Sequence, residues 1–176
     1  MRISIYIATS ANGFISNSRN VPDWLSPEYG KGLVEVCQQK RAVIMGRTTY
    51  EILAPAHLPL KDEGISIVLT SRSDIEPANA TVMFTSDRPD KIASMLQEKG
   101  FTEAVIIGGT AVISEFFNAG LVNDIFMVVE PTLFGGGGLP LLKDVKLDHK
   151  MRLIDSTRLN DNTLKLHYQI VGPRRP

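Results

Sequence analysis

Short runs of alternating hydrophobic and polar residues recur along this chain, and most of them end in glycine, proline or asparagine. Near the start, Ile3, Ile5 and Ile7 alternate with Ser4 and Tyr6, a period of two that is typical of a buried strand. Two strands are also predicted on either side of a turn at residues 160–162. Similar runs predict further strands at residues 42–45, 65–70, 81–84, 104–107 and 124–130.

Between these strands, apolar residues recur at helical spacing. Residues 27–40 hold an apolar stripe, with a proline in the first turn, and predict a helix. Shorter helices are predicted at residues 47–53, 87–99 and 110–119. Strands that alternate with helices and end in a hairpin predict a three-layer α/β fold, with a mostly parallel sheet and an antiparallel C-terminal edge.

The length and charge of the chain narrow the classes of function. Its 176 residues fit one domain, residues 1–176, and no repeat or linker divides them. The 19 basic and 19 acidic residues balance, so no net field favours nucleic acid or a membrane surface as a partner. Cys37 is the single cysteine and no Cys/His cluster has metal-ligand spacing, so we expect neither an intrachain disulfide nor a metal site. The free thiol and the lack of an export signal predict a cytoplasmic protein.

Two strand–glycine–helix junctions carry the candidate chemistry, at residues 43–51 and 105–111. The unpaired N–H groups and the positive dipole end of each helix favour an anion, and Arg47 adds a charge that can grip a phosphate. Two such sites suit a dinucleotide, although neither has the G-x-G-x-x-G spacing of a conventional Rossmann domain. Ser71 and Arg72 follow a third strand and could hold a ribose phosphate. The alternative for all three places is a tight turn or an exposed loop without a ligand.

The segment Val43 to Glu51 resembles the arginine-bearing cofactor motif of dihydrofolate reductases. Four further segments follow in the order and spacing of that family, at residues 8–15, 22–24, 67–71 and 106–117. The resemblance therefore covers nearly the whole chain, and it implies the three-layer dihydrofolate-reductase-like fold.

Other segments resemble the reductase domain of riboflavin-biosynthesis enzymes. Residues 130–137 match it, as do residues 10–13, where Asn12 stands in place of the aspartate usual in that family. Residues 23–25 are similar to a motif of its small stand-alone members, which the chain resembles most closely.

This resemblance implies NADPH as the cofactor. Ala8 and Ile15 would offer backbone groups to the nicotinamide carboxamide, and residues 17–21 would close over it. Ser71 and Arg72 would complete a 2′-phosphate subsite with the arginine of the first junction. The residues implied to hold the phosphates are Gly46, Arg47, Thr48 and Thr49 at the first junction and Gly108, Gly109, Thr110 and Ala111 at the second.

Hydride reduction of a C=N bond also needs a proton donor. Dihydrofolate reductases place a carboxylate five residues after a tryptophan, and here that position is Tyr29. The candidates for the catalytic acid are therefore Asp23 and Glu130, with a solvated surface carboxylate as the alternative for each. Glu130 is preferred because a strand end holds geometry better than a loop. We expect Trp24, Glu28 and Tyr29 to line the substrate site.

The function implied is NADPH-dependent reduction of a pyrimidine- or pterin-like heterocycle, similar to 5-amino-6-(5-phosphoribosylamino)uracil reductase. The alternatives are a dihydrofolate reductase with a displaced acid and a non-catalytic nucleotide- or flavin-binding protein. We also expect a small-molecule substrate and, because related reductases are often dimers, a homodimer. His57, His149 and His167 are predicted to be remote from the pocket, with His167 on the solvent face of the last strand.

Overall fold

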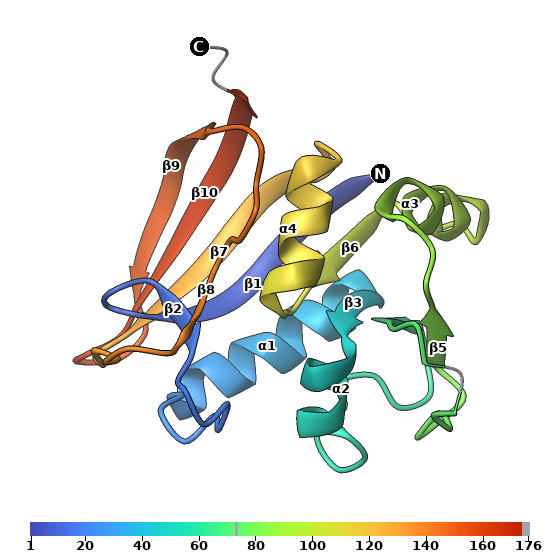
Figure 1. Ribbon diagram of the computed structural model, residues 1–176, viewed down its shortest axis with the longest axis horizontal. Coiled ribbons are helices and arrows are strands. Elements are labelled where there is room, and N and C mark those ends of the chain that lie inside the picture. The colour runs from blue at the N-terminus through green and yellow to red at the C-terminus, as the bar shows by residue number, and fades with distance from the viewer. Residues whose placement is uncertain (73, 174–176) are drawn as a thin grey trace.

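The computed structural model describes residues 1–72 and 74–173 and is built around an eight-stranded sheet (Figure 1). The helices are α1 (Pro27–Lys40), α2 (Arg47–Leu53), α3 (Pro89–Glu98) and α4 (Thr110–Asn118). The strands of the large sheet are β1 (Arg2–Ser10), β3 (Ala42–Gly46), β4 (Ile65–Leu69), β5 (Val82–Thr85), β6 (Glu103–Ile106), β7 (Val122–Glu130), β9 (His149–Arg158) and β10 (Leu164–Pro173). A second sheet pairs β2 (Phe14–Ser16) with β8 (Leu139–Pro140).

The strand order confirms the predicted fold class. The large sheet runs β5-β4-β3-β6-β1-β7-β10-β9, and neighbours from β5 to β7 are parallel. At the other edge of this sheet, β10 pairs antiparallel with β7 and with β9. The predicted helices and strands agree with the observed ones to within about three residues at their ends, whereas the short strands β2 and β8 were not predicted.

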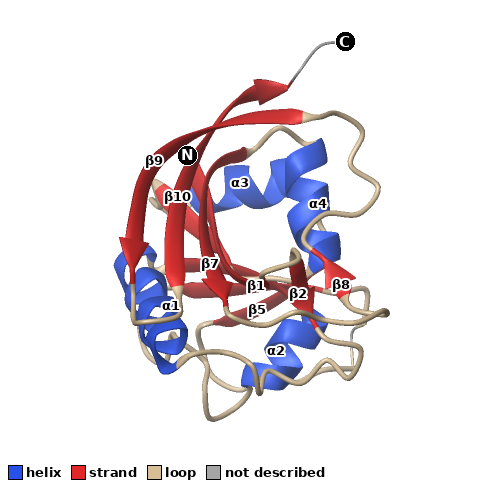
Figure 2. Ribbon diagram, turned by 90° about the vertical axis from the view of Figure 1, so that its left-hand side faces the viewer, coloured by secondary structure: helices blue, strands red, loops and turns tan. Residues whose placement is uncertain are grey.

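Helices cover both faces of the parallel part of the sheet, which makes three layers. In Figure 2, α1 and α2 lie on one side of the sheet and α3 and α4 on the other. Ile3, Ile5 and Ile7 of β1 pack against the α3 and α4 side, whereas Tyr6 and Ala8 pack against the α1 side. The alternating pattern of β1 therefore fills two cores, because successive side chains of a strand point to opposite faces.

Helix α1 is positioned by its ends and by one glycine. The Ser26 hydroxyl accepts a hydrogen bond from the Tyr29 backbone N–H at 3.2 Å, which caps the helix start, and Pro27 occupies the first turn. A Cβ at Gly32 would collide with the Tyr6 hydroxyl. Gly32 therefore lets α1 lie close to β1, although glycine inside a helix lowers its intrinsic stability.

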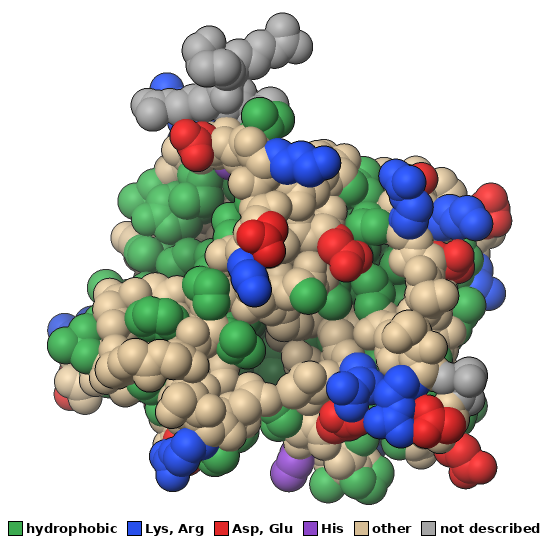
Figure 3. Space-filling view, in the orientation of Figure 1, with side chains coloured by type: hydrophobic (Ala, Val, Ile, Leu, Met, Phe, Trp, Pro, Cys, Tyr) green, Lys and Arg blue, Asp and Glu red, His purple; other side chains and the backbone are tan. Residues whose placement is uncertain are grey.

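In the part of the chain that the structure describes, no helix covers the outer part of the sheet, and apolar side chains are exposed there. Met151 and Leu153 on β9 and Leu164 on β10 are 40%, 52% and 46% exposed. The strand register places all three on one face of the sheet, together with Leu166 and Tyr168. We call these five residues the apolar strip, and Figure 3 shows hydrophobic atoms over β9 and β10 at the upper left.

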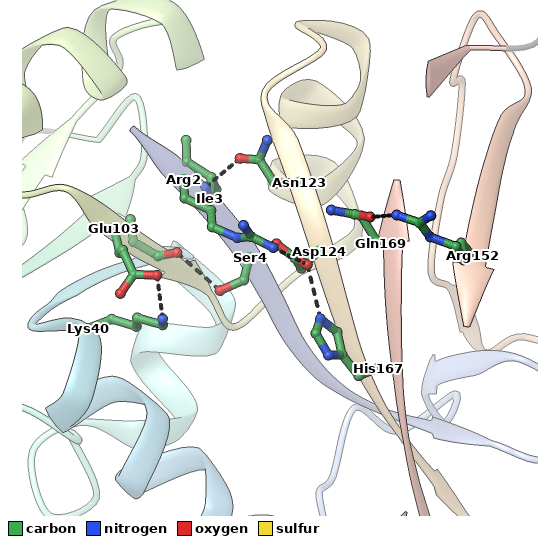
Figure 4. A network of polar contacts seen from close by, with 11 residues as sticks. Arg2, Ile3, Ser4, Lys40, Glu103, Asn123, Asp124, Arg152, His167 and Gln169 are labelled. Atoms are coloured by element: carbon green, nitrogen blue, oxygen red, sulfur yellow. Dashed lines mark hydrogen bonds and ion pairs between the residues drawn. The ribbon is translucent and has the colours of Figure 1, made fainter. Parts of the chain in front are cut away.

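A polar network ties β1, β7 and β10 together at their ends (Figure 4). The Asp124 carboxylate is 2% exposed and accepts hydrogen bonds from Arg2 Nε and Nη2 at 2.7 and 2.8 Å. Its Oδ1 also lies 3.0 Å from His167 Nε2. The His167 ring stacks on the Phe126 ring, with the ring centroids 4.2 Å apart. The prediction that His167 faces solvent is therefore wrong, because the sheet face that it occupies carries a buried carboxylate.

We expect Asp124→Asn to lower the free energy of unfolding by about 1–2 kcal/mol at pH 7, since Asn lacks the negative charge and keeps one acceptor oxygen for Arg2, which is half exposed. Burial alone would raise the pKa of Asp124, but the bonds from Arg2 and His167 outweigh it and hold that pKa below its ordinary value. The carboxylate therefore stabilises the fold above its unfolded pKa of about 4, and this contribution is lost as the pH falls through the lower folded pKa.

Urea unfolding from pH 7 to pH 2 measures this effect. The difference between the wild type and Asp124→Asn should shrink as the pH falls. Asp161→Asn, at an ion pair whose carboxylate is 96% exposed, is the matched control and should change the stability little. A difference that is independent of pH would contradict the role of the carboxylate charge.

Within residues 1–72 and 74–173, no helix has the length and apolarity needed to span a membrane.

Candidate active site

A long groove with a volume of about 970 Å³ opens at the C-terminal edge of the parallel strands and follows one side of α1. Figure 3 shows a hollow with apolar walls just below the lower end of α4. One wall is α1, the facing wall is α2 with residues 56–63, and residues 15–25 border the opening. Ligands of open α/β sheets bind outside the carboxyl ends of the strands, which is where this groove begins.

Both glycine junctions meet at this end of the groove. The parallel strands β3 and β6 are neighbours, so the loops that follow them lie together, and the Gly46 N–H donates to the Gly108 carbonyl at 2.8 Å. The peptide bond between Gly108 and Gly109 is cis. Among the predicted cofactor residues, the groove is lined by Ala8, Ile15, Thr48, Thr49, Gly108 and Gly109.

The two helices that start at these junctions have no side-chain cap. Gly46 precedes α2 and Gly109 precedes α4, and neither helix start receives a side-chain hydrogen bond. Their first N–H groups therefore remain available to a ligand. Thr110 does not line the groove, since its hydroxyl donates to the Pro140 carbonyl at 2.6 Å and so holds β8, while Ala111 is exposed.

The predicted 2′-phosphate residues lie outside the groove, in a surface cluster of four charges: Arg47, Glu51, Arg72 and Asp74. Arg47 Nη1 donates to Glu51 Oε1 at 2.7 Å, and Arg72 binds Asp74 through two nitrogens. The bond from Arg72, with a further contribution from Arg47, lowers the pKa of Asp74 to about 2. Ser71 is exposed beside this charge cluster. Two arginines thus converge, each already paired with a carboxylate that a phosphate would have to displace.

Of the three predicted substrate residues, Trp24 and Tyr29 line the groove and Glu28 does not. Tyr29 is 6% exposed, and its ring stacks on the Tyr6 ring with the ring centroids 5.4 Å apart. Burial raises the pKa of the Tyr29 hydroxyl, so this group stays protonated and can donate a hydrogen bond. The Glu28 carboxylate instead accepts a bond from Asn160 Nδ2 at 2.9 Å.

Trp24 is held by an edge-to-face contact with Phe134, with ring centroids 5.0 Å apart. Asn12 fixes Phe134 from both sides, because its Nδ2 donates to the Phe134 carbonyl at 2.8 Å and its Oδ1 accepts from the Phe134 N–H at 3.1 Å. The two segments with riboflavin-type sequence thus pack on each other and position the tryptophan.

Neither carboxylate predicted as the acid lies in the groove wall. Glu130 is 1% exposed, and its oxygens accept bonds from the Ser26 N–H and hydroxyl at 3.0 and 2.7 Å and from the Thr163 hydroxyl at 3.1 Å. Asp23 points to solvent and pairs with Arg19 at 3.0 Å. This geometry argues against both as direct proton donors: Glu130 ties β7 to the start of α1, and Asp23 braces the loop.

Sequence reasoning missed several residues of the groove. His57 lines it, so the prediction that all histidines are remote is wrong; the chain turns back after α2 through a segment without regular structure. The rest of the apolar wall was also missed, although Leu33 lies four residues after Tyr29, a spacing that places both on one side of α1. The described residues contain no group of three or more His, Cys, Asp or Glu side chains that could hold a metal ion.

Comparison with known proteins places these features in context. The family model for the RibD C-terminal domain matches residues 2–165. The uncharacterized protein YwjB of Bacillus subtilis (strain 168) is 28% identical over 170 residues, which cover 93% of this chain and 95% of that protein.

Two solved structures have a similar fold. A pyrimidine reductase-like protein from Corynebacterium diphtheriae is 13% identical, with a TM-score of 0.79 over 97% of this chain and 92% of that one. Dihydrofolate reductase from Enterococcus faecalis, complexed with NADP(H), is 19% identical, with a TM-score of 0.69 over 97% of each chain. At these identities the likeness confirms the dihydrofolate-reductase-like fold that the motifs implied.

Proposed function

The chain belongs to the RibD C-terminal domain family, and from this premise we propose that it is an NADPH-dependent reductase of a pyrimidine- or pterin-like heterocycle. The observation that carries the proposal is that the two glycine junctions meet at the end of the groove beside the C-terminal ends of the parallel strands. We call this end the head of the groove. Uncapped N–H groups at two helix starts, beside a groove that can hold two rings, fit a dinucleotide and a substrate.

The residues of this chain supply binding and orientation. The backbones of Ala8 and Ile15 would hold the nicotinamide carboxamide, and the start of α4 at Gly109 would face the pyrophosphate. Arg47 and Arg72 are the cations that favour a 2′-phosphate, which distinguishes NADPH from NADH. When bound, NADPH supplies the hydride.

The Tyr29 hydroxyl is the polar group that we expect to orient the substrate ring. Tyr29 lies in the wall at the head of the groove with its hydroxyl against the Ala8 backbone, and because burial raises the pKa of this hydroxyl it stays protonated and can donate to a ring nitrogen or carbonyl. Since neither predicted carboxylate reaches this place, we infer that the transferred proton comes from water in the open groove.

Titration with NADPH and NADH, followed by NADPH oxidation with a panel of pyrimidines and pterins, tests the proposal. We expect tighter binding of NADPH and oxidation that depends on one of the heterocycles. Turnover of dihydrofolate, blocked by an antifolate, would identify a dihydrofolate reductase. NADPH binding without turnover of any heterocycle would favour the non-catalytic alternative, and no NADPH binding at all would overturn the proposal.

We also propose that two copies of the chain associate through the apolar strip. A twofold axis would bury the same strip on both copies, and the zero net charge adds no repulsion. We also propose that the protein is located in the cytoplasm, as the sequence predicts.

Leu153→Lys should convert the dimer to a monomer in sedimentation velocity, because a desolvated charge at the centre of the strip opposes association. Met83→Lys, at a comparably exposed apolar residue on the opposite edge strand, should leave the dimer intact. A monomeric wild type, or a dimer unaffected by Leu153→Lys, would contradict this surface.

A further inference from the structure

We propose that the groove accepts an uncharged, elongated molecule, a flat heterocycle with an apolar tail, and discriminates against a sugar phosphate. The inference narrows the substrate class of the proposed reductase and rests on that function only for the identity of the ring. The observations that carry it are the length of the groove, its apolar middle and the balance of charge at its far end.

The groove is long enough for a ring and a tail. Its wall includes Tyr29 near the start of α1 and Arg41 just past its end, and twelve residues of helix span about 18 Å. Its volume of about 970 Å³ lies near the upper limit for small-molecule sites, so a nicotinamide at the head leaves room for a second ring and a tail.

The middle of the groove is apolar on both walls. Leu33 and Val34 of α1 line the groove, as do Ile52 and Leu53 of α2, and the buried Leu58 follows α2 in the chain. A hydroxyl-rich sugar placed here would lose its hydration without gaining hydrogen bonds from these side chains, which costs free energy. A hydrocarbon tail would instead gain from burial.

The far end of the groove, beside Arg41 and residues 61–63, has no net positive charge to attract a phosphate. With histidine counted as neutral, the charged residues of the groove wall are Arg41, Lys61, Asp62 and Glu63, two of each sign. Arg41 Nη2 is already 3.2 Å from Glu63 Oε2. Phosphate recognition in proteins uses an excess of Arg and Lys, and these four residues provide no such excess.

The direction of α1 works against an anion as well. The helix begins at the head of the groove and ends beside Arg41, so the far end of the groove lies at its C-terminus. A helix C-terminus carries the negative end of the dipole and disfavours an anion within its last turn. The head holds Trp24 and Tyr29, so it presents an uncharged surface to the ring.

Three probes with one ring test the inference: 5,6-diaminouracil, 5-amino-6-(hexylamino)uracil and 5-amino-6-(5-phosphoribosylamino)uracil. Binding is measured by calorimetry with and without NADPH, and Trp24 fluorescence gives a second readout because Trp24 is the single tryptophan and lines the groove. We expect the hexyl probe to bind at least about tenfold more tightly than the other two.

Val34→Lys places a cation in the apolar middle, at a helix residue that is 39% exposed and can therefore accept lysine without disturbing the core. We expect this variant to weaken the hexyl probe and to strengthen the phosphoribosyl probe, each by about tenfold. Met83→Lys, at an apolar residue of similar exposure outside the groove, should change neither. Thermal unfolding of both variants confirms that they are folded.

The two proposals fail in different ways. If NADPH does not bind but the hexyl probe is preferred, the proposed function is wrong and the groove specificity stands. If NADPH binds and the phosphoribosyl probe binds as tightly as the hexyl probe or more so, the specificity is overturned and the reductase stands. Binding of none of the probes, or an unchanged preference in Val34→Lys, also overturns the specificity.

Discussion

Gly109→Val should weaken NADPH binding by at least about a hundredfold while the protein remains folded. Gly109 immediately precedes α4, where the N–H groups lack a side-chain cap and the cofactor pyrophosphate is expected. A phosphate can approach these groups closely only when no side chain stands before them. The valine branches would occupy this space at the wall of the groove.

The structure also explains why the fold should tolerate this change. Gly109 has φ −99° and ψ −165°, an extended conformation open to any residue. A Cβ added there would meet only the Thr49 hydroxyl, at the ordinary contact distance of 3.8 Å. The loss should therefore concern the ligand and not the core.

Calorimetric titration with NADPH, together with thermal unfolding, measures both effects. Gly135→Val is the matched control, since a Cβ at Gly135 meets nothing within 4 Å and this glycine lies away from the groove. If folded Gly109→Val binds NADPH with wild-type affinity, the second junction is only a turn.

Arg47→Ala should weaken NADPH binding by about tenfold to a hundredfold and leave NADH binding nearly unchanged. A charge-assisted hydrogen bond to a phosphate is worth about 1.5–3 kcal/mol. NADH has no 2′-phosphate, so it does not make this bond and the substitution removes nothing from its binding. Arg47 is the member of the charge cluster that lies at the glycine junction, and it now pairs with Glu51.

The ion pair with Glu51 suggests a variant with the opposite effect. Glu51→Gln removes the carboxylate that competes with the phosphate for Arg47, so NADPH should bind several-fold more tightly. Arg158→Ala, which breaks an arginine–aspartate pair on the distant β9–β10 turn, is the matched control for Arg47→Ala and should change the affinity for neither cofactor. Equal binding of NADPH and NADH by the wild type would rule out the assignment of Arg47.

Local patterns determined the fold and the two glycine junctions. The alternation of Ile3, Ile5 and Ile7 predicted a strand because side chains of a strand alternate between faces over a few residues. The junctions at Gly46 and Gly108 could be found because a strand, a glycine and a helix start are neighbours in sequence. Their meeting at 2.8 Å then followed from parallel strands that lie side by side.

The substrate end depended on distances between segments far apart in the chain. Glu130 has the chemistry of an acid, but Ser26 and Thr163, 104 and 33 residues away in sequence, turn it into a buried structural acceptor. His57 lies in an irregular segment whose path carries it to the groove, and no periodicity predicts such a path.

Gly32 likewise has a role that helix propensity alone does not predict. In the sequence it reads as a weak point in a helix, because glycine has a high conformational entropy in the unfolded chain. In the folded protein it is the residue that lets α1 approach Tyr6 and thereby sets the wall of the groove. Residue type and spacing determined which elements form and where the glycine junctions lie, because these depend on neighbours in sequence. Tertiary packing alone decided which side chains face the groove, because that depends on which distant surfaces bury one another.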